Sequence, residues 1–384
     1  MNTTEIKTRV PSFPNIEAVQ AAQLAKKEQR EADLYPRDGS RELFGLERDI
    51  AEMLGVRPGN LLLYNTGMSA VVDALEILRP TAGTRILRAT EGYSQARGYI
   101  NDELKSRGVA VVETNAQSTQ ELNQDLEAKR PDIVFLETVT NGSEMAVLNV
   151  DEFLNLSSLR KLDPLIILDN TLPTSTGLPL GQILETSDRK IIGVESGTKF
   201  LGLNAEMCGM AYTYNLELLS LLRKRRQRTG SLLSASAAET IRDCMPGTAE
   251  EYYRRNKAIF KHTLRLARVC VESQNPESQF VVNHPNLPNH ENSYYVNLHA
   301  PDGISPVLFL VPADLDSHVR IAEALWSNLT ISSLCDLGQS FGFDRTRIWP
   351  DDSSPVVRVS GGIYSEAEQA ALDKAFYQVL SDYQ

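Results

Sequence analysis

The segment IIGVESGTKFLG, residues 191–202, runs from an apolar stretch directly into a lysine, Lys199. A lysine is ordinarily a solvated surface charge, whereas the residues before this one have the composition of a buried strand. A lysine partly removed from water has a lowered pKa and becomes an amine nucleophile, suited to a Schiff base with a carbonyl. The hydroxyls of Ser196 and Thr198 could bind a phosphate, although the order Gly-Thr-Lys-Phe is not that of a P-loop. The segment therefore predicts a strand whose carboxyl end carries a reactive amine.

Six further β-rich runs share this character, and segments with helical periodicity separate most of them. The runs are NLLLYN (60–65), TRILRAT (84–90), GVAVVET (108–114), DIVFLET (132–138), PLIILDN (164–170) and MCGMAYTY (207–214). Between the first two, MSAVVDALEIL (68–78) returns its apolar residues to one helical face. Near-continuous apolar strands that alternate with helices are typical of a parallel sheet covered on both sides. The expected fold class is α/β, with a mostly parallel seven-stranded sheet sandwiched by helices.

The pattern divides the chain into three regions. Residues 1–55 contain two helical segments and an irregular stretch, and we interpret them as an N-terminal arm that makes subunit contacts. Residues 56–245 hold the predicted sheet and form the large domain. Residues 246–384 begin with a long helix and continue through a turn-rich stretch into strands and helices, which predicts a smaller C-terminal α+β domain.

Composition excludes several classes of function. The 384 residues carry a net charge of −11, which argues against general nucleic-acid binding because such binding depends on phosphate neutralisation. One basic run, RKRRQR (223–228), is interpreted as a helix end, and a subunit contact or attraction of an anionic substrate remains an alternative. No apolar run is long enough to span a membrane, and the first residues lack a signal-peptide core, so we expect a cytoplasmic protein. The four cysteines and five histidines lack metal-ligand spacing, and no metal site is expected.

Polar residues follow the predicted strands at the edge where open α/β sheets bind ligands. Gly67 and Met68 open a helix directly after a strand, and backbone N–H groups at such a helix start favour a phosphate, although an ordinary helix cap would look the same. Asp169 ends an apolar strand, where an unpaired carboxylate is costly and calls for a cationic partner, unless it merely caps the next turn. Tyr93, and Glu137 with Asn141, follow two further strands.

An acid, a lysine and a phosphate cradle at one sheet edge suggest pyridoxal 5'-phosphate (PLP). In that interpretation Lys199 carries the aldehyde, and Asp169 keeps the pyridinium nitrogen protonated. The helix start at Gly67 and the nearby hydroxyls hold the phosphate.

Six stretches, in order, resemble the Cys/Met-metabolism PLP enzymes, the group of cystathionine γ-synthase and methionine γ-lyase. LDNTLPTSTGLPLGQ (168–182) followed by IIGVESGTKFLG is similar to the family pattern DNTF…P…G…HSATKYLGG. The other similar stretches are LYPRDGSRELFGLERDIAEMLG (34–55), NTGMSA (65–70), LETVTNG (136–142) and VVRVSGGIYS (356–365). The resemblance covers nearly the whole chain and implies a fold-type-I PLP enzyme.

The resemblance also implies roles for individual residues. Lys199 would be the Schiff-base lysine and proton shuttle, and Tyr93 would stack on the cofactor ring and assist proton transfer. Arg358 would bind the substrate carboxylate in a bidentate manner. The remaining cofactor-binding residues would be Gly67, Met68, Ser196 and Thr198 at the phosphate, Asn141 at the phenolic oxygen, Asp169 at the pyridinium nitrogen, and Tyr35 and Arg37 reaching the phosphate of the neighbouring subunit. The family then implies a homo-oligomer: a dimer that completes the site, and a tetramer built from two dimers.

The departures from the pattern concern the substrate. The family's YGGT is replaced by YSQAR (93–97), and the family's SLGGxES by SSLCDLGQSFGF (332–343). Aligned on Leu-Gly, the serine that helps hold the substrate carboxylate becomes Asp336, and Ser340–Phe341 stand where the family has a glutamate. A carboxylate at Asp336 would repel the substrate's, so either it points away or the substrate presents a cationic or hydroxyl group.

The expected activity is γ-elimination or γ-replacement on an L-amino acid with a leaving group at Cγ, such as an O-acyl, thioether or halogenated amino acid. The departures favour a specialised biosynthetic enzyme. The alternatives are a β-lyase or aminotransferase on the same fold, or a non-catalytic PLP-binding protein.

Overall fold

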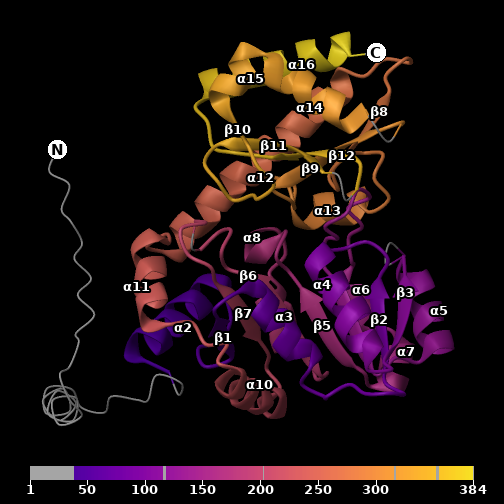
Figure 1. The fold of residues 1–384 in the computed structure, drawn as a ribbon, viewed down its shortest axis with the longest axis vertical. Helices are drawn as coiled ribbons and strands as arrows, with labels where there is room; N and C mark the ends of the chain where they lie inside the picture. Colours follow the sequence, from indigo (N-terminus) through magenta and orange to yellow (C-terminus); the bar gives the residue numbers. More distant parts are fainter. Residues whose placement is uncertain (1–38, 116–117, 202, 315–316, 352–353, 384) are drawn as a thin grey trace, which may run out of the picture.

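The computed structural model of the chain describes residues 39–383, apart from 116–117, 202, 315–316 and 352–353 (Figure 1). The seven predicted strands form one sheet in the order β1-β7-β6-β5-β4-β2-β3. The pairs from β3 through β2, β4 and β5 to β6 are parallel, and β7 runs antiparallel to β6 and β1, so the sheet is mostly parallel, as predicted. The strands are β1 Leu61–Tyr64, β2 Arg85–Ala89, β3 Ala110–Thr114, β4 Ile133–Glu137, β5 Leu165–Asp169, β6 Ile191–Ser196 and β7 Gly209–Tyr212.

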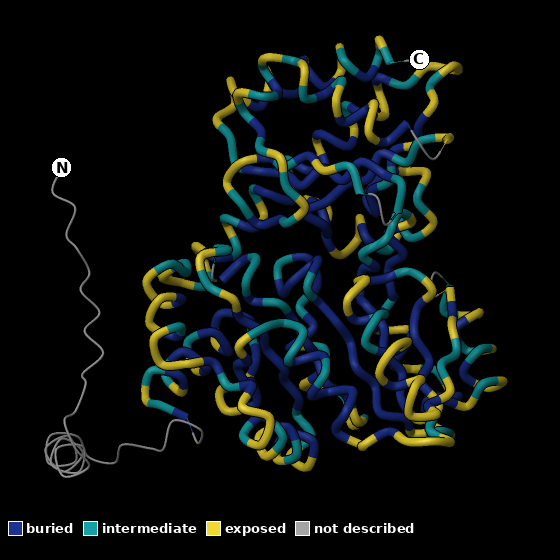
Figure 2. Tube along the Cα trace, in the orientation of Figure 1, coloured by how far each residue is buried: buried dark blue, intermediate teal, exposed yellow. Residues whose placement is uncertain are grey.

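Helices cover both faces of this sheet, and the buried strands lie between them (Figure 2). In β4, Ile133 and Phe135 belong to one apolar cluster, and Val134 and Leu136 belong to the cluster on the other face. This period of two explains why the central strands read as continuous apolar runs. One face packs against α3 Gly67–Leu75, α4 Ser94–Gly98, η1 Tyr99–Leu104 and α10 Leu216–Thr229. The other packs against α2 Arg41–Leu54, α5 Thr119–Lys129, α6 Val150–Leu154, α7 Ser157–Leu162, α9 Leu180–Glu185 and α11 Ala235–Cys244, and the short α8 Thr174–Gly177 follows β5.

A second, five-stranded sheet forms the C-terminal part, in the order β10-β11-β12-β9-β8. Only the β10–β11 pair is parallel. Its strands are β8 Phe280–Asn283, β9 Val307–Pro312, β10 Cys335–Leu337, β11 Thr346–Asp351 and β12 Val356–Ser360. The accompanying helices are α12 Ala249–Glu272, α13 Ser293–His299, α14 Ser317–Ser327, α15 Leu329–Leu334 and α16 Glu366–Asp382. The apolar face of this sheet packs against α14, α15, α16 and the end of α12.

The long helix α12 joins the two parts (Figure 1). Its N-terminal half contributes Tyr252, Ile259 and Phe260 to the core of the large sheet. Its C-terminal half contributes Leu266 and Cys270 to the core of the small sheet. The same helix therefore packs in both cores, and it holds the large sheet and the small sheet in a fixed relative position.

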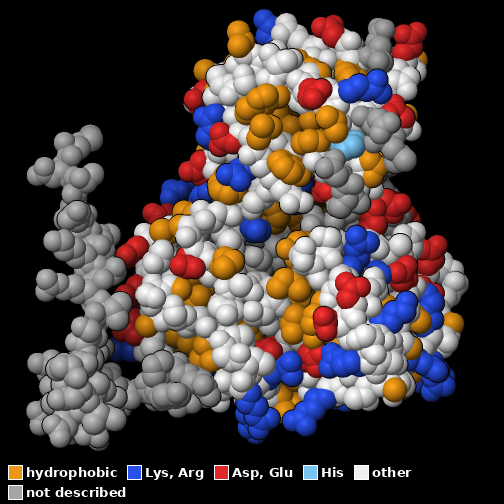
Figure 3. Space-filling view, viewed as in Figure 1, with side chains coloured by type: hydrophobic (Ala, Val, Ile, Leu, Met, Phe, Trp, Pro, Cys, Tyr) orange, Lys and Arg blue, Asp and Glu red, His pale blue; other side chains and the backbone are white. Residues whose placement is uncertain are grey.

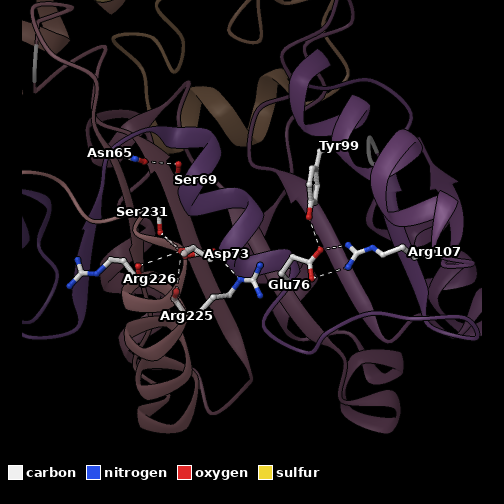
Figure 4. Close-up of polar contacts among 10 residues, drawn as sticks. Asn65, Ser69, Asp73, Glu76, Tyr99, Arg107, Arg225, Arg226 and Ser231 are labelled. Carbon is white, nitrogen blue, oxygen red and sulfur yellow. Dashed lines mark hydrogen bonds and ion pairs between the residues drawn. The ribbon is translucent and has the colours of Figure 1, made fainter. Parts of the chain in front are cut away.

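The basic run of residues 223–228 lies on α10, where basic side chains gather at the lower edge of the molecule (Figure 3). Arg226 is buried and donates from Nη1 to Glu47 Oε1 at 2.5 Å and to the Leu63 carbonyl at 2.6 Å. Arg225 donates to Asp73 Oδ1 at 2.9 Å, and Ser231 donates to the other oxygen of Asp73 (Figure 4). Two of the six residues thus fasten α10 to α2 and α3, which the helix-end interpretation did not include.

Candidate active site

A cavity of about 800 Å³ lies where the carboxyl ends of β4, β5 and β6 face the small sheet. The N-terminus of α3 and the β11–β12 region complete its wall. Nine of the sequence-predicted residues line it: Gly67, Met68, Tyr93, Asn141, Asp169, Ser196, Thr198, Lys199 and Arg358. Residues more than 290 positions apart in the chain therefore meet at one sheet edge.

Three further predicted residues remain: Tyr35, Arg37 and Asp336. Tyr35 and Arg37 lie outside the described residues, so their proposed contact with a neighbouring subunit stays a prediction. Asp336 agrees with the first of the two alternatives, that it points away: it lies on edge strand β10 and accepts a hydrogen bond from Arg345 Nε at 3.0 Å. The following residues, Ser340 and Phe341, line the cavity instead. Because Asp336 is paired away from the cavity, the repulsion expected at the substrate carboxylate does not arise from it.

The start of α3 supplies a cradle for an anion. Thr66 caps the helix by accepting from the Ser69 N–H at 3.0 Å, whereas the N–H groups of Gly67 and Met68 have no acceptor within the helix. A Cβ added to Gly67 would lie 2.9 Å from the Ser196 Cβ, so only glycine permits this close approach. The two N–H groups and the Ser196 hydroxyl consequently border the same space, as phosphate binding requires.

The hydroxyl of Thr198, which was predicted to bind a phosphate, makes two hydrogen bonds with Cys208 in this structure. It donates to the Cys208 carbonyl at 3.1 Å and accepts from the Cys208 N–H at 2.9 Å. These two bonds hold the turn after β6 against the segment that enters β7. Thr198 lines the cavity, but its hydroxyl would have to give up the Cys208 carbonyl to donate to a phosphate.

Asp169 ends β5 with its carboxylate buried at the cavity wall. Oδ1 accepts from the Thr171 N–H at 2.9 Å, so the aspartate does cap the following turn. Burial nevertheless raises the pKa of Asp169, and the described residues offer it no cation within ion-pair distance. The capping interpretation is therefore confirmed, and pairing with the pyridinium nitrogen of PLP stays a prediction.

Glu137 is a site residue that the sequence analysis noted but did not assign. Its Oε1 accepts from the Tyr93 N–H at 2.5 Å, and its Oε2 accepts from the Asn141 N–H at 2.7 Å. One buried carboxylate thus positions both the tyrosine and the asparagine. Burial, and next the charge of Asp169, raise the pKa of Glu137. Its signal in the sequence was its place at the end of β4, four residues before Asn141.

Lys199 and Arg358 bring two cations to the cavity from different parts of the chain. Burial lowers the pKa of Lys199, and the neighbouring positive charge of Arg358 lowers it further. Arg358 is 5% exposed, and burial lowers its pKa to about 10. Neither makes a hydrogen bond or ion pair with another described residue; both lie over aromatic rings instead. A lysine with a lowered pKa is a better nucleophile, and an unpaired arginine is ready for an anionic ligand.

Glu195 lies behind the phosphate cradle and shares a polar network with the sheet. Its Oε1 accepts from the Tyr212 hydroxyl at 2.7 Å and from Asn170 Nδ2 at 3.2 Å. Burial raises the pKa of Glu195 to about 8. Burial therefore favours the neutral form of this carboxyl.

The residues present fit PLP. The buried Oδ1 of Asn141 has no hydrogen-bond partner among the described residues, so this side chain has bonding capacity left for a ligand. Together with the cradle at Gly67 and the unpaired carboxylate of Asp169, it marks three places where a phosphorylated pyridine would be bound. The described residues contain no cluster of potential metal ligands, and none of the described helices is long and apolar enough to span a membrane.

The family model of the Cys/Met metabolism PLP-dependent enzymes matches residues 12–342. The chain belongs to this family. It is 26% identical over 300 residues to the chloroplastic cystathionine γ-synthase 1 of Nicotiana tabacum and 24% identical over 291 residues to that of Arabidopsis thaliana. These alignments cover 78% and 76% of this chain but 52% and 48% of the plant proteins, so the chain spans about half the length of these curated relatives.

Solved structures of the family share the fold of this enzyme. Cystathionine γ-synthase from Xanthomonas oryzae pv. oryzae in complex with cystathionine has a TM-score of 0.75 at 18% identity, covering 92% of this chain and 89% of that chain. MetB from Corynebacterium glutamicum has a TM-score of 0.74 at 18% identity, with coverage of 91% and 88%. The fold class and the dependence on PLP that the sequence predicted are thereby confirmed.

Proposed function

We propose that this enzyme eliminates or replaces the γ-substituent of an L-amino acid. The observation that carries the proposal is the meeting of Lys199, Asp169 and Arg358 around one cavity. PLP, when bound, supplies the electron sink that makes the hydrogen atoms on Cα and then Cβ acidic. The plant relatives are cystathionine γ-synthases, and their similarity favours replacement by a thiol over simple elimination.

Each residue has a role in that reaction. Arg358 binds the substrate carboxylate and so fixes which bond at Cα faces Lys199. Lys199 would hold PLP through its amine; once the substrate's amine has displaced it, the freed amine of Lys199 would accept the proton from Cα and return protons to the carbon skeleton. Asp169 would keep a proton on the pyridine nitrogen of PLP, and Tyr93, which also lines the cavity, would contact the ring and assist proton transfer.

We also propose that the active unit is a dimer, because Tyr35 and Arg37 match residues that reach a neighbouring subunit's phosphate. Size measurement by light scattering, with and without residues 1–38, tests this point. A monomer that retains full activity would contradict it.

The test of the reaction is a panel of γ-substituted amino acids (O-acyl, thioether and halogenated), given to the PLP-loaded protein with and without a thiol. Product masses separate replacement, in which the thiol sulfur is joined to Cγ, from elimination, which gives ammonia and a 2-oxo acid. We expect at least one member to be turned over and the Lys199→Ala variant to be inactive. Transfer of the amine to the cofactor, with no loss of the γ-group, would instead indicate an aminotransferase.

A further inference from the structure

Phe341 is the one residue whose ring lies near both Lys199 and Arg358, among the cation–π contacts of the described residues. Its centroid is 5.4 Å from Arg358 Cζ and 5.8 Å from Lys199 Nζ. Both distances are within the range of a cation–π interaction. Phe341 also belongs to the stretch in which the chain departs from the family pattern, where a glutamate is expected.

The position of this ring is fixed by the backbone around it. The Phe341 carbonyl accepts from Asn204 Nδ2 at 3.2 Å, and the next carbonyl, of Gly342, accepts from Arg255 Nη2 at 2.9 Å. Gly342 has φ +83°, and a Cβ there would lie 2.2 Å from the Lys199 carbonyl oxygen. The segment therefore packs closely against the backbone of Lys199, and this packing restricts movement of the Phe341 ring away from the cavity wall.

A second ring completes the surroundings of Arg358. The centroid of Phe309, on β9, is 5.8 Å from Arg358 Cζ. The buried Nε of Arg358 has no hydrogen-bond acceptor among the described residues, and the charges that act on it come from Asp351, Tyr93 and Glu137. Two aromatic faces therefore attract the guanidinium electrostatically without occupying its N–H groups.

We propose that Phe341 is a positioning residue that holds Arg358 and Lys199 at the cavity wall without neutralising either, so that the substrate carboxylate becomes the ion partner of Arg358. The inference rests on the proposed function, in which Arg358 binds that carboxylate. A carboxylate side chain at position 341 would instead lie beside both cations and compete with the substrate. The aromatic ring thus favours tight binding of the amino-acid carboxylate.

The test uses the PLP-loaded protein titrated with L-alanine, which has no γ-substituent, and follows the visible absorbance change. We expect Phe341→Leu to raise the apparent Kd for alanine about 10-fold, the loss of roughly one desolvated cation–π contact. Phe341→Tyr keeps a π face and should stay within about twofold of wild type. Phe341→Glu should weaken binding more than leucine does, by about 100-fold, because it pairs with Arg358.

Phe343→Leu is the matched control. Its ring lies 3.3 Å from Arg347 Cζ and is not among the residues lining the cavity, so the variant removes a similar contact elsewhere and should leave the alanine Kd unchanged. Site-specific 3,4,5-trifluorophenylalanine at position 341 keeps the shape but weakens the ring's negative face, and it should raise the Kd in the same direction as leucine. This variant decides the matter if leucine fails to fold.

Two outcomes would overturn the inference: leucine and trifluorophenylalanine variants that bind alanine like wild type, or a glutamate variant that binds it as well or better. Failure of the proposed function has a different signature, because it is read from the γ-substituted panel, where no member would lose its γ-group. A wild type that shows no absorbance change with alanine would overturn the role of Arg358 in carboxylate binding and, with it, the inference. A change in wild type that the ring substitutions leave unaltered overturns the role of Phe341 alone.

Discussion

Two groups of buried charges in this enzyme are built in opposite ways. Where α10 meets α2, Glu47 faces Arg226 at 2.5 Å. Where α10 meets α3, Asp73 faces Arg225 at 2.9 Å (Figure 4). At the carboxyl edge, Asp169 accepts a backbone N–H, while Lys199 and Arg358 lie over aromatic rings. The first group pairs opposite charges, whereas in the second neither Asp169, Lys199 nor Arg358 has an ion-pair partner among the described residues.

The presence or absence of an ion-pair partner distinguishes charges that stabilise the fold from charges that bind a ligand. A paired buried charge gains its stability from its partner, and removing that partner is costly. An unpaired one shifts its pKa, and such shifts gather at functional sites. Burial also raises the pKa of Asp73 in spite of Arg225, so the shift alone does not separate the groups. Partnership does.

The largest expected effect comes from breaking the paired group. Arg226→Met leaves Glu47 buried without its cation and should lower the free energy of unfolding by about 3–5 kcal/mol. Urea denaturation measures this change. The double variant Glu47→Gln/Arg226→Met should recover much of the loss, whereas additive losses would contradict a direct ion pair. Turnover per folded molecule should stay at the wild-type value.

Asp169→Asn is the matching change in the unpaired group. The amide does not hold the pyridine nitrogen protonated, so kcat/KM should fall about 100-fold to 1,000-fold. Steady-state kinetics on the best substrate of the γ-substituted panel measures it. Stability should be unchanged or slightly higher, because a buried carboxylate without a cation is removed. A stable, fully active variant would show that Asp169 only caps its turn.

The second group could be predicted from the sequence because the end of an apolar run marks the end of a strand. The apolar run before Asp169 and the small residues before Lys199 identified two neighbouring strands, and parallel pairing brings their ends together. The long helix predicted at the start of the C-terminal region is α12, Ala249–Glu272. In the C-terminal region the apolar pattern is weakest for β8, β10 and β11, because β8 and β10 are short and all three are partly exposed.

Side-chain partners, by contrast, could not be predicted. The alignment on Leu-Gly brought Asp336 to the substrate, but nothing local in the sequence indicates that Arg345 lies beside it. The hydroxyl of Thr198 is similarly committed to Cys208, ten residues away. Contacts of this kind depend on how strands and loops pack in three dimensions, and a pattern of periodicity carries no information about them.

A smaller effect is expected from pH. The folded-state pKa of Glu195 is raised to about 8 by burial, so between its unfolded value and that pH the folded chain holds a proton that the unfolded chain has lost. Stability should therefore fall as pH rises from about 5 to about 8, by about 1.4 kcal/mol per pH unit for this one carboxyl. Glu195→Gln should flatten this slope in urea titrations at several pH values. An unchanged slope would mean that Glu195 is ionised in the fold.

The smallest effect is predicted for Asp336→Asn. The pair with Arg345 is nearly half exposed, so its loss should cost about 0–1 kcal/mol of unfolding free energy. KM for the amino-acid substrate should stay within about twofold of wild type, because the residue does not line the cavity. A KM change of tenfold or more would indicate that Asp336 does contact the substrate.

The central claim is that Lys199 carries the cofactor. The most direct measurement is to load the protein with PLP, reduce it with borohydride, digest it and determine the peptide masses by mass spectrometry. We expect one modified lysine, Lys199, and no modified peptide in the Lys199→Ala variant. Attachment to a different lysine, with Lys199 unmodified, would contradict it.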